Sequence, residues 1–305
     1  GNIQCDVDNL KLSADPCVPT VIVVVKNDFA KMQLFFEHYR KLGVHQFIVI
    51  NNESNDGTFE FVKQQSDTRV YTVTEAFQTQ KKEAWIEKVI AVTGYNRWYV
   101  VVDSDELIDF VGSEEHSLET MIRIMYSKGY KRLWGLLLDM YSKEPLFSID
   151  CSYEKIPEKF CYFDNESYSL NLKNDINAKR ENDEIIGGPR YRVFSLLNTQ
   201  SKQAIFYFEK DNLYRNCHYL YPLIGWGDVP CCFVLRHYKF LKIDEYSYRL
   251  RVKDRNFYND SIEYNKYFEK LSEGNQISFY YEKSNKYENS SSLLKLPFIE
   301  KIQWK

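Results

Sequence analysis

The sequence lacks several patterns that mark well-known classes of protein. No apolar run approaches the roughly 18 residues that a membrane-spanning helix needs, and no arrangement typical of a signal peptide opens the chain. The formal net charge is only -3 over 305 residues, so no strong basic field is present to hold a nucleic acid backbone. We therefore expect a protein with no transmembrane segment and no nucleic acid partner.

The cysteines also lack any regular spacing. The chain has seven of them, no Cys-x-x-Cys occurs, and Cys231 and Cys232 are adjacent. An odd count without framework spacing indicates free thiols in a reducing compartment and argues against a zinc site. We therefore expect a cytoplasmic location. The chain begins at Gly1 without a methionine, which suggests one domain of a longer protein.

Aromatic residues, by contrast, are abundant. They make up 16% of the chain, with 24 tyrosines and 20 phenylalanines. Tyrosine-rich surfaces suit sugars, because the ring packs on apolar C–H faces while the hydroxyl group forms hydrogen bonds. Drift in composition would give the same percentages, so this feature alone selects no function.

Hydrophobic periodicity predicts an α/β fold. Apolar runs alternate with helical patterns through the first hundred residues, which is typical of a mostly parallel sheet. Gly43 is expected to end the first helix. Strands are expected at 19–25, 46–50, 70–73 and 98–102, and helices at 29–42, 58–65 and 80–93. Further on we expect a helix at 118–128, a strand at 133–138, irregular structure over 142–185, an apolar segment at 234–240 and charged helices over 243–272.

The most informative stretch runs from Trp98 to Glu106. A strand of apolar residues ends abruptly at Asp103-Ser-Asp-Glu106. Carboxylates at i and i+2 at a strand end can converge on one hard cation, and Mg²⁺ or Mn²⁺ bound there keeps positions open for phosphate oxygens. A solvated acidic turn is the alternative reading. The pattern favours an enzyme that handles a nucleoside diphosphate.

Two other polar loops follow strand ends. They cover residues 26–28 and 51–56, and Asp56 is placed to cap the helix expected at 58–65. Ligands of parallel sheets bind beyond the carboxyl ends of the strands. The three loops are therefore expected to line one crevice.

A recognisable order of motifs runs from Val21 to Ile108. It comprises a strand, Lys-Asn-Asp, Phe-Phe-x-x-Tyr-x-x-Leu-Gly-Val, a strand, Asn-Asn-x-Ser-x-Asp-Gly-Thr, and Trp-x-x-x-x-Asp-x-Asp-Glu. This order resembles the family-2-like glycosyltransferases of the GT-A fold. Later blocks, from Leu138-Asp-Met-Tyr141 to Arg236-His-Tyr-Lys-Phe-Leu241, resemble one bacterial branch of that group.

The resemblance implies a fold and an activity. The fold is a GT-A (Rossmann-like), mostly parallel sheet flanked by helices, with a C-terminal helical or irregular extension. The activity is metal-dependent, inverting transfer of a sugar from a nucleoside diphosphate donor, with UDP-hexose favoured, to a glycan or glycoprotein hydroxyl in bacterial surface polysaccharide or adhesin glycosylation. The implied division is a lead-in at 1–18, a nucleotide-sugar-binding half at 19–141, an acceptor-binding half at 142–241 and a helical extension at 242–305.

The metal ligands are predicted to be Asp103 and Asp105, joined by a late histidine. His237 is the first candidate for that histidine because it follows an apolar stretch that can return it to the first sheet, and His218 is the second. Neutral imidazole is a good ligand for Mn²⁺. The cofactor is therefore expected to be Mn²⁺ or Mg²⁺.

Other residues are candidates for the nucleotide sugar. Lys26, Asn27 and Asn52 lie where the base and ribose of the donor are expected, although asparagine also favours turns without any ligand. Many members of the resembled group carry Asp-Asp where this chain has Asn51-Asn52, which leaves the base open. Arg190 and Arg192 suit bidentate phosphate contacts, or they lie exposed on a surface strand.

Inverting transfer needs a general base for the acceptor hydroxyl. Asp139, at the end of a strand, is the first candidate, and Asp228 is the second. Asp183 and Glu184 are the candidates after those.

Two other functions remain open. One is a catalytically inactive sugar-binding or scaffolding domain of the same fold. The other is a nucleotidyltransferase, which usually opens with a glycine-rich basic loop, and no such loop precedes Asp28.

Overall fold

The computed structural model describes residues 3–171, 184–223, 230–254, 262–272 and 276–304. Two of the candidate residues, Asp228 and Asp183, lie outside the described residues. None of the described helices combines the length and apolarity that crossing a bilayer requires.

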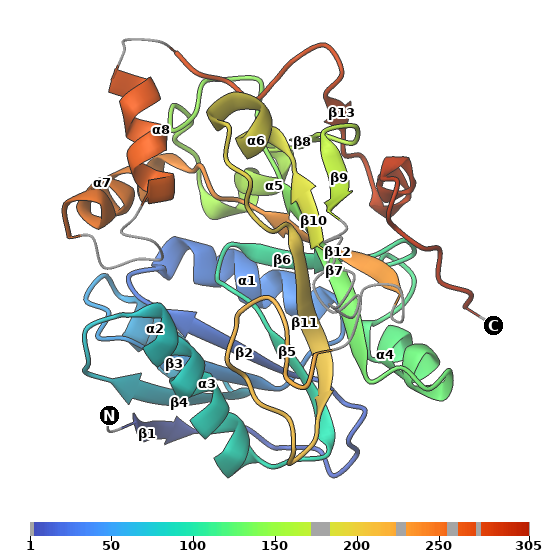
Figure 1. Cartoon of the computed structure of the whole chain (residues 1–305). Coiled ribbons are helices and arrows are strands. Elements are labelled where there is room, and N and C mark those ends of the chain that lie inside the picture. The colour runs from blue at the N-terminus through green and yellow to red at the C-terminus, as the bar shows by residue number, and fades with distance from the viewer. Residues whose placement is uncertain (1–2, 172–183, 224–229, 255–261, 273–275, 305) are drawn as a thin grey trace.

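A nine-stranded sheet forms the centre of the described structure, in the order β1-β4-β3-β2-β5-β11-β7-β12-β6. Strands β2, β3, β4, β5, β7 and β12 run in one direction, and β1, β11 and β6 run in the other. The bounds are β1 Ile3–Asp8, β2 Thr20–Val25, β3 Phe47–Asn51, β4 Thr68–Val73, β5 Arg97–Val101, β6 Glu106–Asp109, β7 Arg132–Asp139, β11 Ser201–Phe208 and β12 Cys231–His237. The predicted α/β class with a mostly parallel sheet is confirmed (Figure 1).

Helices cover both faces of the sheet. The first hundred residues supply most of them, close to the predicted positions, and Gly43 follows the first helix with a left-handed φ of 82°. The bounds are α1 Phe29–Lys41, α2 Thr58–Lys63, α3 Thr79–Thr93 and α4 Leu118–Ser127. Apolar residues of α1 and α4 pack in one core cluster and those of α3 in another. Buried parallel strands need both faces covered, which explains their continuous apolar runs.

Several elements were not predicted. β1 lies in the expected lead-in 1–18 and pairs with β4, and β11 enters the sheet antiparallel between β5 and β7. The segment expected to be irregular is partly regular, so that prediction was wrong in part. Its elements, and those just after it, are η1 Tyr153–Lys155, α5 Ile156–Lys159, β8 Tyr162–Phe163, β9 Tyr168–Asn171, β10 Glu184–Gly187 and α6 Pro189–Phe194.

The C-terminal part is built on aromatic residues. Helices α7 Glu245–Asp254 and α8 Ile262–Ser272 follow the short turn η4 Lys242–Asp244, and β13 Asn285–Lys286 and η6 Ser290–Lys295 come after them. Phe194 of α6, Phe240, Tyr248 of α7 and Tyr267 of α8 share one buried cluster. Aromatic pairs of this kind stabilise through edge-to-face contacts as well as burial. The cluster holds these helices over the carboxyl edge of the sheet (Figure 1).

Candidate active site

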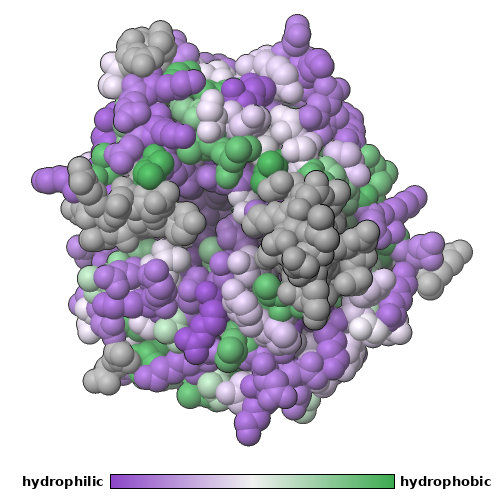
Figure 2. Space-filling model, in the orientation of Figure 1, coloured by the Kyte–Doolittle hydropathy of each residue, from purple (hydrophilic) through white to green (hydrophobic). Residues whose placement is uncertain are grey.

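A cavity of about 900 Å³ opens at the carboxyl edge of the sheet. Figure 2 shows the molecule hollowed near its centre, with hydrophilic residues inside the hollow. All three polar loops reach the cavity, which is also lined by the start of α3, the end of β12, and helices α7 and α8. A large concave site with several charged groups is the usual form of a ligand pocket. The sheet thus gathers onto one cavity the loops that the sequence places far apart.

The end of β12 presents His237 to this cavity. Strands β12 and β7 are parallel neighbours, and their register sets His237 directly beside Asp139. His237 Nδ1 lies 2.8 Å from Asp139 Oδ1, so the ring N–H donates to that carboxylate. The other ring nitrogen, Nε2, lies 3.7 Å from Oδ2 of Asp105 on the loop after β5. The imidazole is therefore held between a buried carboxylate and a carboxylate of the cavity wall.

Asp139 has both oxygens engaged. Oδ2 accepts from Arg190 Nε at 2.7 Å, while Oδ1 accepts from His237. Burial alone would raise the pKa of Asp139, but Arg190 and His237 outweigh burial and lower this pKa. A carboxylate that is ionised, buried and doubly bonded orients an imidazole well and accepts a further proton poorly. Its contacts favour a positioning role over the predicted role of general base.

Asp103 faces a different partner from Asp105. Oδ1 of Asp103 pairs with the ammonium group of Lys82 in α3. Lys82 also lines the cavity. Burial alone would raise the pKa of Asp103, but the ammonium groups of Lys82 and Lys202 outweigh it and lower this pKa. Glu106 accepts from the backbone N–H of Asp103 at 2.9 Å and so orients the loop. Asp103 stays ionised and brings a cation to the cavity wall.

The geometry fits a divalent cation at one point of the cavity. In the described part of the chain, no group of three or more His, Cys, Asp or Glu side chains is gathered to hold a metal ion. Asp105 and His237 nevertheless point a carboxylate oxygen and a ring nitrogen toward each other. Metal–ligand bonds of about 2.0–2.2 Å set two ligands of one ion roughly 3–4 Å apart. The separation of this pair matches two protein ligands of an ion that takes its other ligands from substrate or water.

Asn52 has an unsatisfied acceptor. Its side-chain N–H groups donate to the carbonyl oxygens of Val73 at 3.2 Å and Glu75 at 2.9 Å. Its own Oδ1 is buried and has no hydrogen-bond partner. Buried acceptors in proteins are nearly always paired, so a ligand or water molecule whose N–H or O–H reached this oxygen would satisfy it.

The two other candidates for the nucleotide sugar, Asn27 and Lys26, lie directly after β2. Asn27 adopts a left-handed φ of 57°, and its Oδ1 accepts from the backbone N–H of Asn55 at 2.8 Å. This is the turn chemistry that asparagine favours. Lys26 is exposed and lines the cavity together with Asn27. The N-cap of α2 is Gly57, and Asp56, one residue earlier, accepts from the backbone N–H of Thr58 at 3.0 Å.

Neither predicted arginine lies on the cavity lining. Both belong to helix α6, where residues two apart point in different directions, so the alternative of an exposed surface strand is wrong. Arg190 donates to Asp139 and to Oε1 of Glu263 at 3.0 Å. Arg192 makes two hydrogen bonds of 3.0 Å to Asp164. Arg190 therefore supports the site through Asp139 and Glu263, Arg192 pairs with a carboxylate that does not line the cavity, and the contacts of neither arginine favour phosphate binding.

His218 also lies off the cavity lining, with its Nδ1 2.9 Å from the carbonyl oxygen of Ser201.

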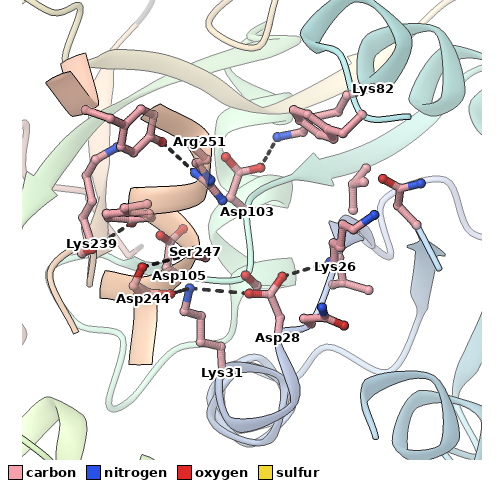
Figure 3. Close-up of a pocket in the computed structure, with 18 of the residues that line it drawn as sticks. Lys26, Asp28, Lys31, Lys82, Asp103, Asp105, Lys239, Asp244, Ser247 and Arg251 are labelled. Carbon is pink, nitrogen blue, oxygen red and sulfur yellow. Dashed lines mark hydrogen bonds and ion pairs between the residues drawn. The ribbon is translucent and has the colours of Figure 1, made fainter. Parts of the chain in front are cut away.

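Several cavity residues were not predicted from the sequence, because they belong to helices whose charged residues have no distinctive spacing. They are Lys31 of α1, Lys82 and Glu83 of α3, Asp244 of η4, Arg251 of α7 and Glu263 of α8. Figure 3 shows Lys31 between Asp28 and Asp244, with Asp105 beside them.

Comparisons with known proteins give only partial likenesses. No protein-family description matches the chain, and no curated protein matches it. Among solved structures, S. aureus TarS matches at 16% identity over 42% of this chain and 24% of that chain, with a TM-score of 0.30. Glucosyl-3-phosphoglycerate synthase from Mycobacterium tuberculosis, in complex with Mn²⁺, UDP and phosphoglyceric acid, matches at 18% identity over 41% and 44%, with a TM-score of 0.27. The matched part spans less than half of either neighbour, so the site is interpreted from its own geometry.

Proposed function

We propose that this chain is a glycosyltransferase that uses a divalent metal ion to move a sugar from a nucleoside diphosphate donor to a hydroxyl group. The observation that carries the proposal is the Asp105–His237 pair, which faces an open cavity at the carboxyl edge of an α/β sheet. Asp139 supports the imidazole from behind at 2.8 Å. Carboxylate support of a ligating histidine is a recurrent feature of metal sites in proteins.

Asp105 and His237 would hold Mn²⁺ or Mg²⁺. Such an ion, when bound, stabilises the negative charge of the departing diphosphate as a Lewis acid. Lys82 and Lys26 add cationic groups on the cavity wall, and an ammonium group suits phosphate oxygens. Asp103 then acts by holding Lys82 in place, in addition to the ligand role that the motif predicts for it.

UDP is the favoured donor nucleotide. The buried Oδ1 of Asn52 needs a hydrogen-bond donor, and the N3–H of uracil supplies one. Adenine offers no ring N–H at its pairing edge, whereas guanine N1–H and thymine N3–H would serve as well as uracil, and UDP is preferred among these because of the sequence resemblance. We further propose that the donor is a UDP-hexose, that the reaction inverts the anomeric carbon, and that the acceptor is a glycan or a glycoprotein. We also propose a cytoplasmic location, on the basis of the irregular cysteines, and a role in bacterial surface polysaccharide or adhesin glycosylation, on the basis of the sequence resemblance.

One observation favours a second candidate. The ion pair of Lys82 with Asp103 occupies the first carboxylate of the Asp-x-Asp motif, as expected for a sugar-binding domain that has lost its chemistry. Such a domain would bind a nucleotide sugar without turning it over. Turnover therefore separates the two candidates.

The test is release of UDP from a panel of UDP-sugars, with water as the acceptor. We expect slow release in Mn²⁺ from at least one donor, with loss in excess EDTA and in Asp105→Asn. Binding of UDP without release from any donor would select the inactive domain. Release that is unaffected by EDTA would refute the metal site.

A further inference from the structure

The proposed reaction needs a group that accepts the proton of the attacking hydroxyl, and most carboxylates of the cavity are already engaged. Asp56 caps backbone N–H groups through both oxygens, to Thr58 at 3.0 Å and to Phe29 at 3.1 Å. Glu263 accepts from Arg190 and Tyr267 and pairs with Lys239 at 3.2 Å. Carboxylates held by several donors are poor proton acceptors.

Asp244 differs from these groups. Its Oδ1 lies 2.5 Å from the Lys31 ammonium, while its Oδ2 is buried and has no hydrogen-bond partner. Of the carboxylates that line the cavity in the described part of the chain, Asp244 alone has a buried oxygen of this kind. A buried acceptor left unpaired costs free energy and calls for an explanation, of which a catalytic role is one. Asp244 lines the cavity and its side chain keeps 8% of its surface exposed, so the carboxylate can meet a bound acceptor there.

The charges around Asp244 suit proton transfer near neutral pH. They are the Lys31 ammonium and the Asp28 carboxylate at the start of α1, Asp105 on the loop after β5, and Tyr248 and Arg251 on α7. Burial raises the pKa of Asp244 to about 6, outweighing the attraction of Lys31. The pKa of the nearby Asp105 is instead lowered, because His237 and Lys31 outweigh its burial. Two carboxylates whose environments push their pKa values apart are the usual arrangement for one base and one permanently ionised ligand.

We propose that Asp244 is the general base of this enzyme, a role that rests on the proposed function. A lone pair of the acceptor oxygen forms the new bond to the anomeric carbon of the donor sugar. The bond between that carbon and the β-phosphate oxygen breaks, and its electron pair leaves on the nucleoside diphosphate. The hydroxyl proton passes to the Asp244 carboxylate. Lys31 holds this carboxylate in place through its ion pair.

Asp244→Asn tests the proposal without a known acceptor, because water takes the acceptor's place in donor hydrolysis. We expect UDP release from the best UDP-sugar to fall by about 10²-fold or more, while Mn²⁺-dependent binding of UDP in calorimetry stays within about twofold. The wild-type rate should fall as pH drops through about 6, with the carboxyl group protonated, and this acid limb should be absent from the variant. Asp150→Asn is the matched control, because Asp150 pairs with Lys242 of the same η4 turn on the exposed side.

The outcomes separate the inference from the proposed function. Normal release by Asp244→Asn overturns the assignment of Asp244 alone, as does loss of UDP binding in that variant. A wild-type protein that neither binds UDP with Mn²⁺ nor releases it from any donor overturns the proposed function and this inference together. Should Asp244→Asn not fold, the double variant Lys31→Met/Asp244→Asn removes both charges of this ion pair together, and a rate equal to wild type in that variant also overturns the assignment.

Discussion

At the scale of single residues, the site depends on contacts between positions far apart in the chain. His237 and Asp139 are 98 residues apart and are brought together by the register of β12 on β7. The sequence indicates that both residues lie at strand ends, which is why both were predicted as site residues. It does not indicate that the strands are neighbours. For that reason Asp139 was predicted to accept a proton, whereas its contacts fit the support of an imidazole.

Asp139→Asn tests this supporting role. An amide at this position cannot match the ionised carboxylate as acceptor for both His237 and Arg190. We expect Mn²⁺-dependent binding of UDP to weaken by about 10–100-fold, as for other groups that support metal ligands. Calorimetric titration of the variant with UDP in Mn²⁺ measures the effect.

Asp164→Asn is the matched control, because Asp164 is an equally buried carboxylate paired with an arginine of the same helix. It should leave the Mn²⁺ dependence of UDP binding unchanged. Equal UDP affinity in wild type and Asp139→Asn would show that the imidazole needs no support from Asp139.

At the scale of elements, strands with continuous apolar runs could be predicted and strands defined by distant pairing could not. β2 and β3 are buried along almost their whole length, so their sequences alone identify them. β11 reads Ser-Lys-Gln-Ala-Ile-Phe-Tyr-Phe, a partly polar sequence that is buried only because it lies between β5 and β7. Helix α6 was missed for a related reason, since its arginines are stabilised by carboxylates on other elements.

Arg190 of α6 forms ion pairs with residues of two other elements, so replacing it tests how much these contacts between elements stabilise the fold. It is buried on α6 and pairs with Asp139 of β7 and Glu263 of α8. Arg190→Met would leave the buried Asp139 carboxylate without this partner, which we expect to lower the free energy of unfolding by about 3–5 kcal/mol.

Urea denaturation measures this loss. The matched control is Arg249→Met, since Arg249 forms an exposed pair with Glu245 on α7, where the expected change is within about 0.5 kcal/mol. Similar losses in the two variants would show that the buried network contributes nothing specific.

At the scale of the whole molecule, the cavity is closed on one side by the sheet and on the other by α7 and α8. The sheet side could be predicted, because strand ends carry polar loops in a known geometry. The helical side could not, because Lys31, Asp244 and Glu263 are ordinary charged residues until folding places them on one cavity. Their ion pairs tie the turn η4 to α1, and helix α8 to α6 and to Lys239 just after β12.

These ion pairs predict how stability depends on pH. Burial alone would raise the pKa of Glu263, but Lys239 and Arg190 outweigh it and lower this pKa far below the ordinary value of 4.5. The unfolded state therefore binds the proton first as pH falls. The stabilisation from Glu263 is present above pH 4.5 and is lost as pH falls below that value.

Urea denaturation without added metal, at several pH values, checks this expectation. Glu263→Gln should be less stable than wild type by more than about 1 kcal/mol at neutral pH, and the gap should shrink below pH 4.5. A gap that stays constant with pH would show that Glu263 stabilises by packing and not by charge.

The proposed function depends on a divalent ion that Asp105 and His237 hold and that binds the donor's diphosphate. The most direct measurement is calorimetric titration with UDP, in Mn²⁺ and in excess EDTA, for wild type and His237→Ala. We expect wild type to bind UDP in Mn²⁺ with at least about tenfold higher affinity than in EDTA, and His237→Ala to lose most of this difference. Equal UDP affinity in Mn²⁺ and in EDTA, or an unchanged Mn²⁺ dependence in His237→Ala, would contradict the proposed metal site.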